Sequence, residues 1–316
     1  MKVFHRDTSG FSLIELLIVV AIFAIVMGGV FTLYNTHLKN AYKQDENLDV
    51  QQNLRLAMDT ISRDIKMAGM LVPITATPLF SSTVSFSNYT SSVTLNVSSP
   101  DGVYARIFTA KVTGAFTNLS TTVDSSEAVD AFIGTNKPTD RIRIISPFNN
   151  SLTLKAAFST YTSIVFVSGN RTAKSLQLQR AGGAAFAAGI GLNVGDVVAK
   201  GAGTSDYDTI VYSLMTGTGV GGTGNGCPAG QSCLFRSVNR ASPGDVVAGN
   251  ISSLRFSYIF SDNTENKKPD LSYVSSIKSV RVTLQGVPAS AKTASEIAKK
   301  TRQITSVVML RNRRTN

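Results

Sequence analysis

The segment that most constrains this chain is an apolar run near its N-terminus. From Leu16 to Phe31 no residue is charged or strongly polar, and a single carboxylate, Glu15, stands at the front of the run. A helix over residues 16–34 would be roughly 28 Å long, close to the ~30 Å hydrocarbon core of a bilayer. The run therefore predicts a membrane-spanning helix. Because charge is costly at that depth, Glu15 is a candidate functional residue.

The residues before the run look like a leader peptide. They include Lys2 and Arg6, and positive charge before an apolar helix keeps that end of the chain in the cytoplasm. A secretory signal has small residues after its apolar run, but residues 31–36 read Phe-Thr-Leu-Tyr-Asn-Thr. The small residue, Gly10, comes before the run instead. Cleavage after Gly10 would leave the helix on the mature protein, whereas a generic membrane anchor gives no reason for Gly10-Phe11.

This order of leader, glycine, aromatic residue, acid and apolar span resembles the prepilin N-terminus of type IV pilins and type II secretion pseudopilins. The matching residues are Gly10, Phe11, Ser12–Ile14 and Glu15. The resemblance implies that prepilin peptidase cuts after Gly10 and methylates the amine of Phe11, and that Glu15 docks the subunit onto a filament. A buried unpaired carboxylate costs several kcal/mol. The terminal amine of a neighbouring subunit would supply the counter-charge.

Helical periodicity continues after the apolar run. Apolar residues recur at steps of three and four along one face: Val50, Leu54, Met58, Ile61, Ile65 and Ala68. Gly69 is a plausible helix end, and Pro73 follows just beyond it. We therefore expect one long helix from about Phe11 to Gly69, whose apolar face packs on the following region.

The chain thus divides into four segments. They are a leader at 1–10, a transmembrane and assembly helix at 11–34, its amphipathic continuation at 35–70 and a globular region at 71–316. Gly28-Gly29 interrupts the apolar half, and two interpretations stay open: a point of local unwinding, or a close approach of another helix.

Short runs of alternating polar and apolar residues dominate the chain beyond Thr75. Eight such runs predict strands: 93–97, 141–145, 163–167, 175–179, 209–212, 254–258, 280–284 and 304–310. Residues 293–300 are one short helical candidate. The expected fold class is α+β, with the long N-terminal helix packed on a mostly antiparallel, β-rich globular region, as in pilins. The pattern does not distinguish one sheet from two.

The only two cysteines, Cys227 and Cys233, are predicted to form a disulfide in an oxidising exported compartment. Closing so small a loop contributes about 2 kcal/mol. A zinc site is the alternative, but the globular region has no histidine and no further cysteine, so carboxylates would have to complete it.

Other candidate motifs are weak. Residues 217–222 fit G-x-G-x-x-G, but more glycines follow instead of a helix, which favours a flexible loop over a phosphate site. Residues 262–266 could ligate calcium but lack EF-hand spacing, which favours a solvated turn. After leader removal the single histidine is His37, near the membrane, so we expect no enzyme, no cofactor and no metal.

The formal net charge of +11 would permit attraction to nucleic acid or anionic surfaces. The basic residues are scattered, with a modest concentration at 292–314, and no nucleic-acid-binding motif accompanies them. A solvated basic surface is the favoured interpretation.

Within the family, residues 63–69 resemble the end of the helix in PilW-type minor pilins. Residues 246–258, 279–284 and 310–313 resemble later segments of that group, to which J-type pseudopilins are related, whereas 72–245 show no resemblance. Glu15 argues against tip subunits of the K or X type, which commonly lack this acid.

The resemblance implies a minor pilin that primes pilus assembly near the filament tip. Its expected partners are other minor and major pilins through the N-terminal helix, prepilin peptidase and the inner-membrane assembly platform. The expected location is the inner membrane, with a periplasmic C-terminal region, and then the pilus at the cell surface. Two alternatives stay open: a J-type pseudopilin of type II secretion, and a filament-displayed module that binds DNA or surfaces.

Overall fold

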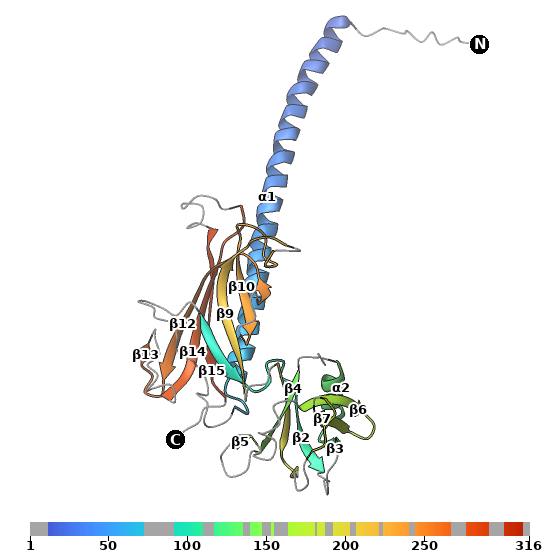
Figure 1. The fold of residues 1–316 in the computed structure, drawn as a ribbon. Coiled ribbons are helices and arrows are strands. Elements are labelled where there is room, and N and C mark those ends of the chain that lie inside the picture. The colour runs from blue at the N-terminus through green and yellow to red at the C-terminus, as the bar shows by residue number, and fades with distance from the viewer. Residues whose placement is uncertain are drawn as a thin grey trace, which may run out of the picture. The chain divides into compact units, whose positions relative to one another are not determined.

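The fold is known from a computed structural model (Figure 1). It describes residues 12–72, 92–109, 117–134, 140–146, 153–154, 164–180, 182–186, 192–202, 207–220, 224–239, 244–266, 276–290 and 300–311. The chain divides into two compact units, Met1–Asp49 and Val50–Asn316.

Helix α1 (Leu13–Met67) is one continuous helix of 55 residues. The described part of the first unit consists of this helix alone. The second unit contains the rest of α1 and every strand. The helix ends as expected, since Gly69 has a φ of 74° and its amide donates to the carbonyl of Asn96.

Two four-stranded antiparallel sheets and the second part of α1 form what we call the body. Their strand orders are β1-β9-β10-β11 and β13-β12-β14-β15. The bounds are β1 (Val93–Val97), β9 (Asp208–Thr216), β10 (Ser232–Val238), β11 (Asp245–Ala248), β12 (Ile251–Phe260), β13 (Glu265–Asn266), β14 (Ile277–Gly286) and β15 (Arg302–Met309).

The core of the body lies between α1 and these sheets. Alternate residues of the strands face it, such as Phe256 on β12 and Val282 on β14. The helix contributes the predicted apolar stripe to this core, and Ala57 lies in the core as well. Gly286 allows the close approach, because a Cβ there would lie 2.8 Å from the Cγ1 of Val50.

A second group of strands, between β1 and β9 in the chain, forms what we call the inserted module (Val103–Gly201). Its seven strands are antiparallel in the order β5-β4-β8-β2-β3-β7-β6. The bounds are β2 (Tyr104–Thr109), β3 (Asn118–Val123), α2 (Ser126–Gly134), β4 (Arg141–Ser146), β5 (Thr153–Leu154), β6 (Ile164–Asn170), β7 (Ser175–Arg180) and β8 (Val197–Gly201). The module has its own core, where Phe132 of α2 packs against Phe166 of β6 with ring centroids 5.9 Å apart.

The α+β class, the long helix and the antiparallel strands are confirmed. Each of the eight runs predicted as strands overlaps a strand, although residue 163 lies outside the described residues and Leu310 follows the end of β15. The described residues form three sheets, whereas the sequence pattern did not distinguish one sheet from two. The candidate helix at 293–300 lies outside the described residues except for Lys300.

Candidate functional site

The first part of α1 presents an uninterrupted apolar surface. The helix begins where the carbonyl of Ser12 accepts hydrogen bonds from the amides of Glu15 and Leu16, at 3.0 and 3.2 Å. Glu15 lies in the first turn, where an acid is favoured by the helix dipole. Gly10 and Phe11 lie outside the described residues.

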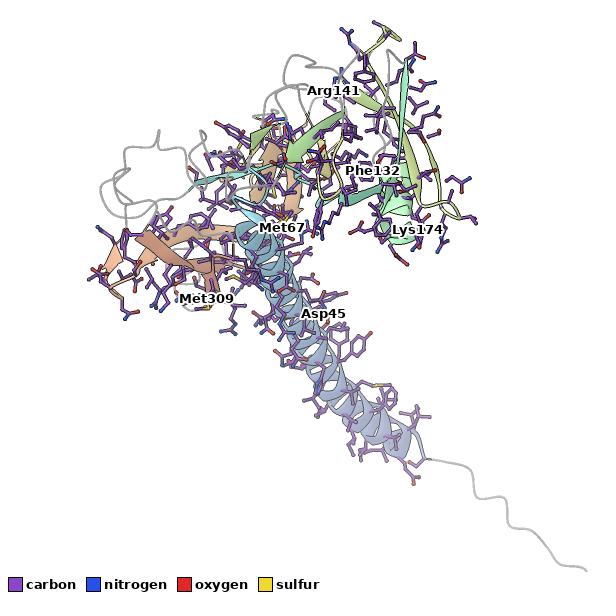
Figure 2. The ribbon with its side chains drawn as sticks, turned by 90° about the horizontal axis from the view of Figure 1, so that it is seen from below. Asp45, Met67, Phe132, Arg141, Lys174 and Met309 are labelled. Carbon is purple, nitrogen blue, oxygen red and sulfur yellow. A yellow bond between two sulfur atoms is a disulfide. The ribbon has the colours of Figure 1, made fainter. Side chains whose placement is uncertain are left out.

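The side chains that follow Glu15 are exposed, from Leu16 at 59% to Tyr34 at 59%, and Figure 2 shows side chains projecting from this part of α1. Among the described residues, α1 is the one helix that is long and apolar enough to cross a membrane, and none of that window is buried. So large an exposed apolar surface requires lipid or other helices to cover it.

Gly28 and Gly29 lie inside α1 without interrupting it. A Cβ at either position would meet nothing within 4 Å, so no contact of the described chain requires a glycine there. The hydroxyl of Thr32 donates to the carbonyl of Gly28 at 2.8 Å, and Thr36 does the same to Thr32 at 2.9 Å. The helix is regular here, which leaves close approach of another helix as a use for the glycines.

A buried acid, which the sequence analysis did not single out, ties the second part of α1 to β9 and β10. Asp64 is 1% exposed and accepts hydrogen bonds from the hydroxyl of Tyr212 and from Nε of Arg236, both at 2.6 Å. Arg236 also donates to the carbonyl of Pro100 at 2.8 Å. The helical periodicity could have predicted its burial, because Asp64 follows Ala57 and Ile61 at helical spacing on the buried face.

The electrostatics of this cluster fix its protonation. Burial, followed by the negative charge of Asp64, raises the pKa of Tyr212 far above its ordinary value. Burial alone would lower the pKa of Arg236, but Asp64 more than offsets it and that pKa is also raised. Tyr212 is therefore neutral and Arg236 is charged at neutral pH.

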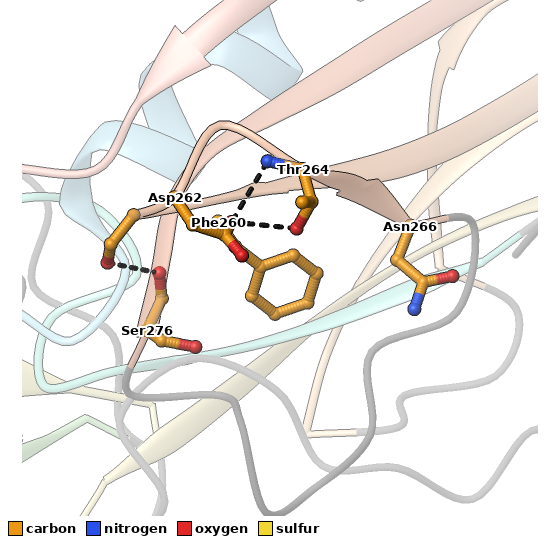
Figure 3. Close-up of a pocket in the computed structure, with 6 residues that line it drawn as sticks. Phe260, Asp262, Thr264, Asn266 and Ser276 are labelled. Atoms are coloured by element: carbon orange, nitrogen blue, oxygen red, sulfur yellow. Dashed lines mark hydrogen bonds between the residues drawn. The ribbon is translucent and has the colours of Figure 1, made fainter.

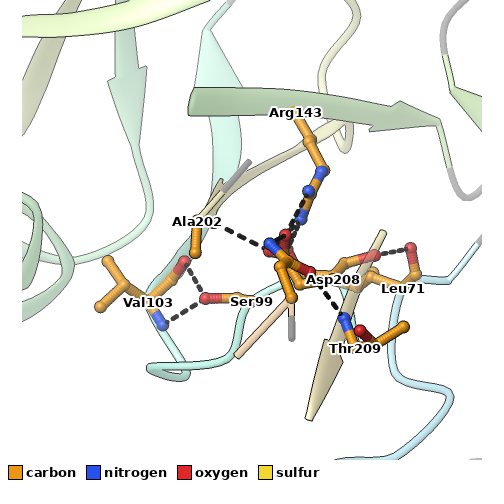
Figure 4. A network of polar contacts seen from close by, with 9 residues as sticks. Leu71, Ser99, Val103, Arg143, Ala202, Asp208 and Thr209 are labelled. Atoms are coloured by element: carbon orange, nitrogen blue, oxygen red, sulfur yellow. Dashed lines mark hydrogen bonds and ion pairs between the residues drawn. The ribbon is translucent and has the colours of Figure 1, made fainter. Parts of the chain in front are cut away.

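A second buried cluster joins the inserted module to the body (Figure 4). Arg143 on β4 donates from Nη1 and Nη2 to the carboxylate of Asp208 at the start of β9, at 2.7 and 3.0 Å. Nη1 also donates to the carbonyl of Ser98 at 2.6 Å. The amide of Ala202 and the Nδ2 of Asn239 complete the shell of Asp208, at 2.8 and 2.6 Å.

The cluster contains a residue from each of the two chain segments that connect the body with the inserted module. Ser98 follows β1, and Ala202 follows β8. Asp208 is fully buried and Arg143 is 5% exposed, so removing either would leave an uncompensated charge, which costs about 3–5 kcal/mol. Gly201 is required beside them because a Cβ there would lie 2.2 Å from Nη1 of Arg143. This ion pair therefore holds the inserted module on the body.

The cysteines form the expected disulfide, Cys227–Cys233. The glycine-rich loop before them is anchored to the same turn. Gly217 donates to the carbonyl of Gln231 at 2.7 Å, and Gly219 to that of Cys227 at 3.0 Å. This segment leads into strand β10 rather than into a helix N-terminus, so it lacks the geometry of a phosphate-binding loop.

A pocket of about 410 Å³ lies where β12 and β13 end and β14 begins (Figure 3). The described residues that line it are Phe260, Ser261, Asp262, Thr264, Asn266 and Ser276. Oδ1 of Asp262 accepts hydrogen bonds from the amide and the hydroxyl of Thr264, at 2.9 and 2.7 Å. These bonds lower the pKa of Asp262 and keep it ionised.

The acids near this pocket do not converge on a cation. Glu265 pairs with Arg281 at 3.0 Å and accepts from Ser257 at 2.6 Å. Across the described part of the chain, no group of three or more His, Cys, Asp or Glu could hold a metal. The geometry therefore favours the solvated turn over the calcium site at 262–266.

Comparison with known protein families gives a match for the N-terminal segment that contains the start of α1. The model of the prokaryotic N-terminal methylation motif matches residues 5–31, which include Gly10, Phe11 and Glu15. No curated protein and no solved structure matches the chain. The prepilin-type motif, followed by a long apolar helix and a β-rich antiparallel region, supports a type IV pilin-like or pseudopilin-like protein.

Proposed function

We propose that the chain is a minor pilin of a type IV pilus that takes part in priming pilus assembly near the filament tip. The observation that carries the proposal is the continuity of the methylation motif with an exposed apolar helix that has one acid at its start. In this proposal prepilin peptidase cleaves after Gly10 and methylates the amine of Phe11.

The charge distribution along α1 supports the role that we propose for Glu15. Between Ser12 and Thr36 the chain has no basic residue, and the first one that follows Glu15 is His37 or Lys39. At about 1.5 Å per residue, either is more than roughly 30 Å away along the helix. Once Glu15 enters a dry bundle of helices, the N-terminal amine of Phe11 in a neighbouring subunit is the natural counter-charge.

We also propose a location and a set of partners for the subunit. The subunit waits in the inner membrane with residues beyond the span in the periplasm, and then enters the filament at the cell surface. Its partners are other minor and major pilins along α1, prepilin peptidase and the inner-membrane assembly platform. The described residues hold no metal cluster, and we expect neither enzymatic activity nor a cofactor.

Mass spectrometry of the mature N-terminus tests the processing step. We expect a chain that begins with a methylated Phe11, and we expect Gly10→Val to leave the full precursor in the membrane. Ser9→Val adds similar bulk one residue earlier and is the matched control. Normal cleavage of Gly10→Val would contradict the proposal.

A second experiment tests assembly. Glu15→Ala should insert into the membrane normally but reach purified pili at a level reduced by tenfold or more, whereas Asp45→Ala, an exposed acid on the same helix, should not. If deletion of the gene blocks secretion of exported proteins and leaves pili intact, the chain is a J-type pseudopilin instead.

A further inference from the structure

Strand β15 (Arg302–Met309) forms a sheet edge that the described part of the chain leaves open. It pairs with β14 on one side, and no described strand pairs with its other side. We propose that this edge binds an extended segment of another protein, which adds a strand to the sheet. The proposal does not depend on which filament the chain enters, because β15 lies in the globular region and not on the helix that would enter the filament.

The register of β15 shows which of its backbone groups face outward. The amide of Leu310 donates to the carbonyl of Lys278 at 3.2 Å, so these two residues form a hydrogen-bonded pair just beyond the end of β15. In an antiparallel ladder such pairs recur at every second residue. The even-numbered residues of β15 therefore bond to β14, whereas the amides and carbonyls of the odd-numbered residues point away from it. These odd-numbered residues are Gln303, Thr305, Val307 and Met309.

The other sheet edges of the described chain are short, irregular or buried. β13 and β5 have two residues each, and β11 has four. A register shift interrupts the pairing of β6. β1 is mostly buried, and the carbonyl of its Asn96 accepts a hydrogen bond from the amide of Gly69. β15, in contrast, has eight residues, no proline and no register shift, and a long regular edge of this kind pairs readily with strands of other chains.

The side chains of β15 also lack the usual protection of an edge. Charged residues, above all lysine, commonly keep other strands away from an edge, but residues 303–310 are all uncharged. Val307 is 48% exposed and Met309 is 61% exposed, while Val308 between them lies in the core of the body. An added strand would therefore gain backbone hydrogen bonds from the edge and apolar contacts beside Val307 and Met309.

The sequence on either side of this uncharged stretch indicates the charge of the partner. Basic residues flank it at both ends: Lys299, Lys300 and Arg302 before it, and Arg311, Arg313 and Arg314 after it. No ion pair of the described residues involves Arg302 or Arg311. Two copies of β15 that paired with each other would bring like charges together in either orientation, which is unfavourable. The partner is therefore a different chain, with acidic residues at both ends of an uncharged segment.

Hydrogen exchange of the full chain in a zwitterionic detergent tests whether the edge is open. Val307 and Val308 are adjacent residues of the same type, and only the amide of Val308 faces β14. Nuclear magnetic resonance with valine labelled by nitrogen-15 follows both amides, which Val307→Ile and Val308→Ile assign. We expect the amide of Val307 to exchange about 100-fold faster than that of Val308.

The same measurement reports the binding of a model strand. The probe is the peptide Glu-Glu-Thr-Val-Thr-Val-Thr-Val-Glu-Glu, added up to about 1 mM, which detects any Kd in the micromolar range. We expect it to slow the exchange of Val307 by about tenfold or more and to leave Val308 unchanged. The peptide with lysine in place of each glutamate should bind about tenfold more weakly. The peptide with a methyl group on every central amide should not bind, because it has no donors for the edge.

A substitution on β15 locates the binding. Thr305→Pro removes one outward amide without removing a hydrogen bond to β14, and proline is tolerated at such edge positions. It should weaken binding of the glutamate peptide by about tenfold. Thr305→Ala also loses the threonine side chain but keeps the amide. It is the matched control and should bind as the parent does.

Four results would overturn the proposal. Equally slow exchange of Val307 and Val308 in the chain alone would mean that the edge is already covered. Unchanged exchange of Val307 with the glutamate peptide, or binding that Thr305→Pro leaves intact, would mean that β15 does not accept a strand. A dimer of the chain in sedimentation equilibrium that Thr305→Pro abolishes would make the partner a second copy. Slow exchange of Val308 in each variant shows that the sheet is folded, so lost binding cannot be mistaken for unfolding.

Discussion

The two parts of helix α1 have the same secondary structure and opposite environments. From Leu16 to Phe31 nearly every side chain is apolar and exposed, whereas from Val50 to Ala68 a single stripe is buried and the other faces are polar. The second part finds its partner within the chain, in the two sheets of the body. Among the described residues the first part has no such partner, so its apolar surface requires lipid or the helices of other proteins to cover it.

The contrast also concerns charge. Asp64 in the second part has two partners on β9 and β10, and the chain satisfies it internally. Glu15 in the first part precedes a stretch without a basic residue. Asp64 therefore serves folding, and we propose that Glu15 serves assembly.

The largest expected effect comes from removing the internally paired acid. Asp64→Ala leaves Arg236, whose side chain is 12% exposed, without its carboxylate, which should destabilise the body by about 3 kcal/mol. Urea unfolding of the full chain in detergent, followed by circular dichroism, measures the loss. Asp59→Ala, at an exposed position one turn earlier, should change the free energy of unfolding by less than about 0.5 kcal/mol. Equal effects of the two would contradict the role of Asp64.

Truncation of one isoleucine in each part tests the difference in burial directly. Ile61 is fully buried, so Ile61→Ala should cost about 3 kcal/mol of unfolding free energy in the same experiment. Ile18 is 55% exposed, and Ile18→Ala should leave that free energy unchanged. A comparable loss from Ile18→Ala would mean that the first part of α1 also supports the fold of this chain.

The Tyr212 hydroxyl gives a smaller effect with a distinct pH dependence. Tyr212→Phe removes one hydrogen bond to Asp64 and should cost about 2 kcal/mol at neutral pH. The folded state raises the pKa of Tyr212, whereas the unfolded chain titrates near pH 10. The stabilisation is therefore complete below about pH 10 and is lost as the pH rises beyond it. The difference between parent and variant should narrow at pH 11; a constant difference would contradict this assignment.

Much of this fold could be predicted because its signals are local. The stripe from Val50 to Ala68 has strict helical spacing, and strands such as β1 and β12 alternate at period two. Helix α2 was not predicted, because its nine residues contain too few helical turns for a periodic pattern to be recognised. Strand β10 was missed because it buries adjacent residues, Leu234 and Phe235, which breaks the alternation.

The polar clusters were hidden for a different reason. Arg143 and Asp208 lie on separate strands 65 residues apart, and nothing in either local pattern reveals that one accepts hydrogen bonds from the other. The existence of two separate cores likewise depends on which strands pair, which sequence periodicity does not report. Glu15 was singled out from its neighbours along the chain, and its role in assembly stays a prediction.

The smallest expected effect concerns Gly28, in the exposed part of α1. No atom of the described chain lies within 4 Å of a Cβ placed there, so Gly28→Ala should stabilise the isolated helix by about 0.5–1 kcal/mol. Hydrogen exchange of the amides near residue 30, in detergent, should slow accordingly. If another helix approaches closely at this point in the filament, Gly28→Ala should also reduce incorporation into pili, and Ala24→Gly should not. Faster exchange in Gly28→Ala would show that the glycine supports the helix in a way this geometry does not explain.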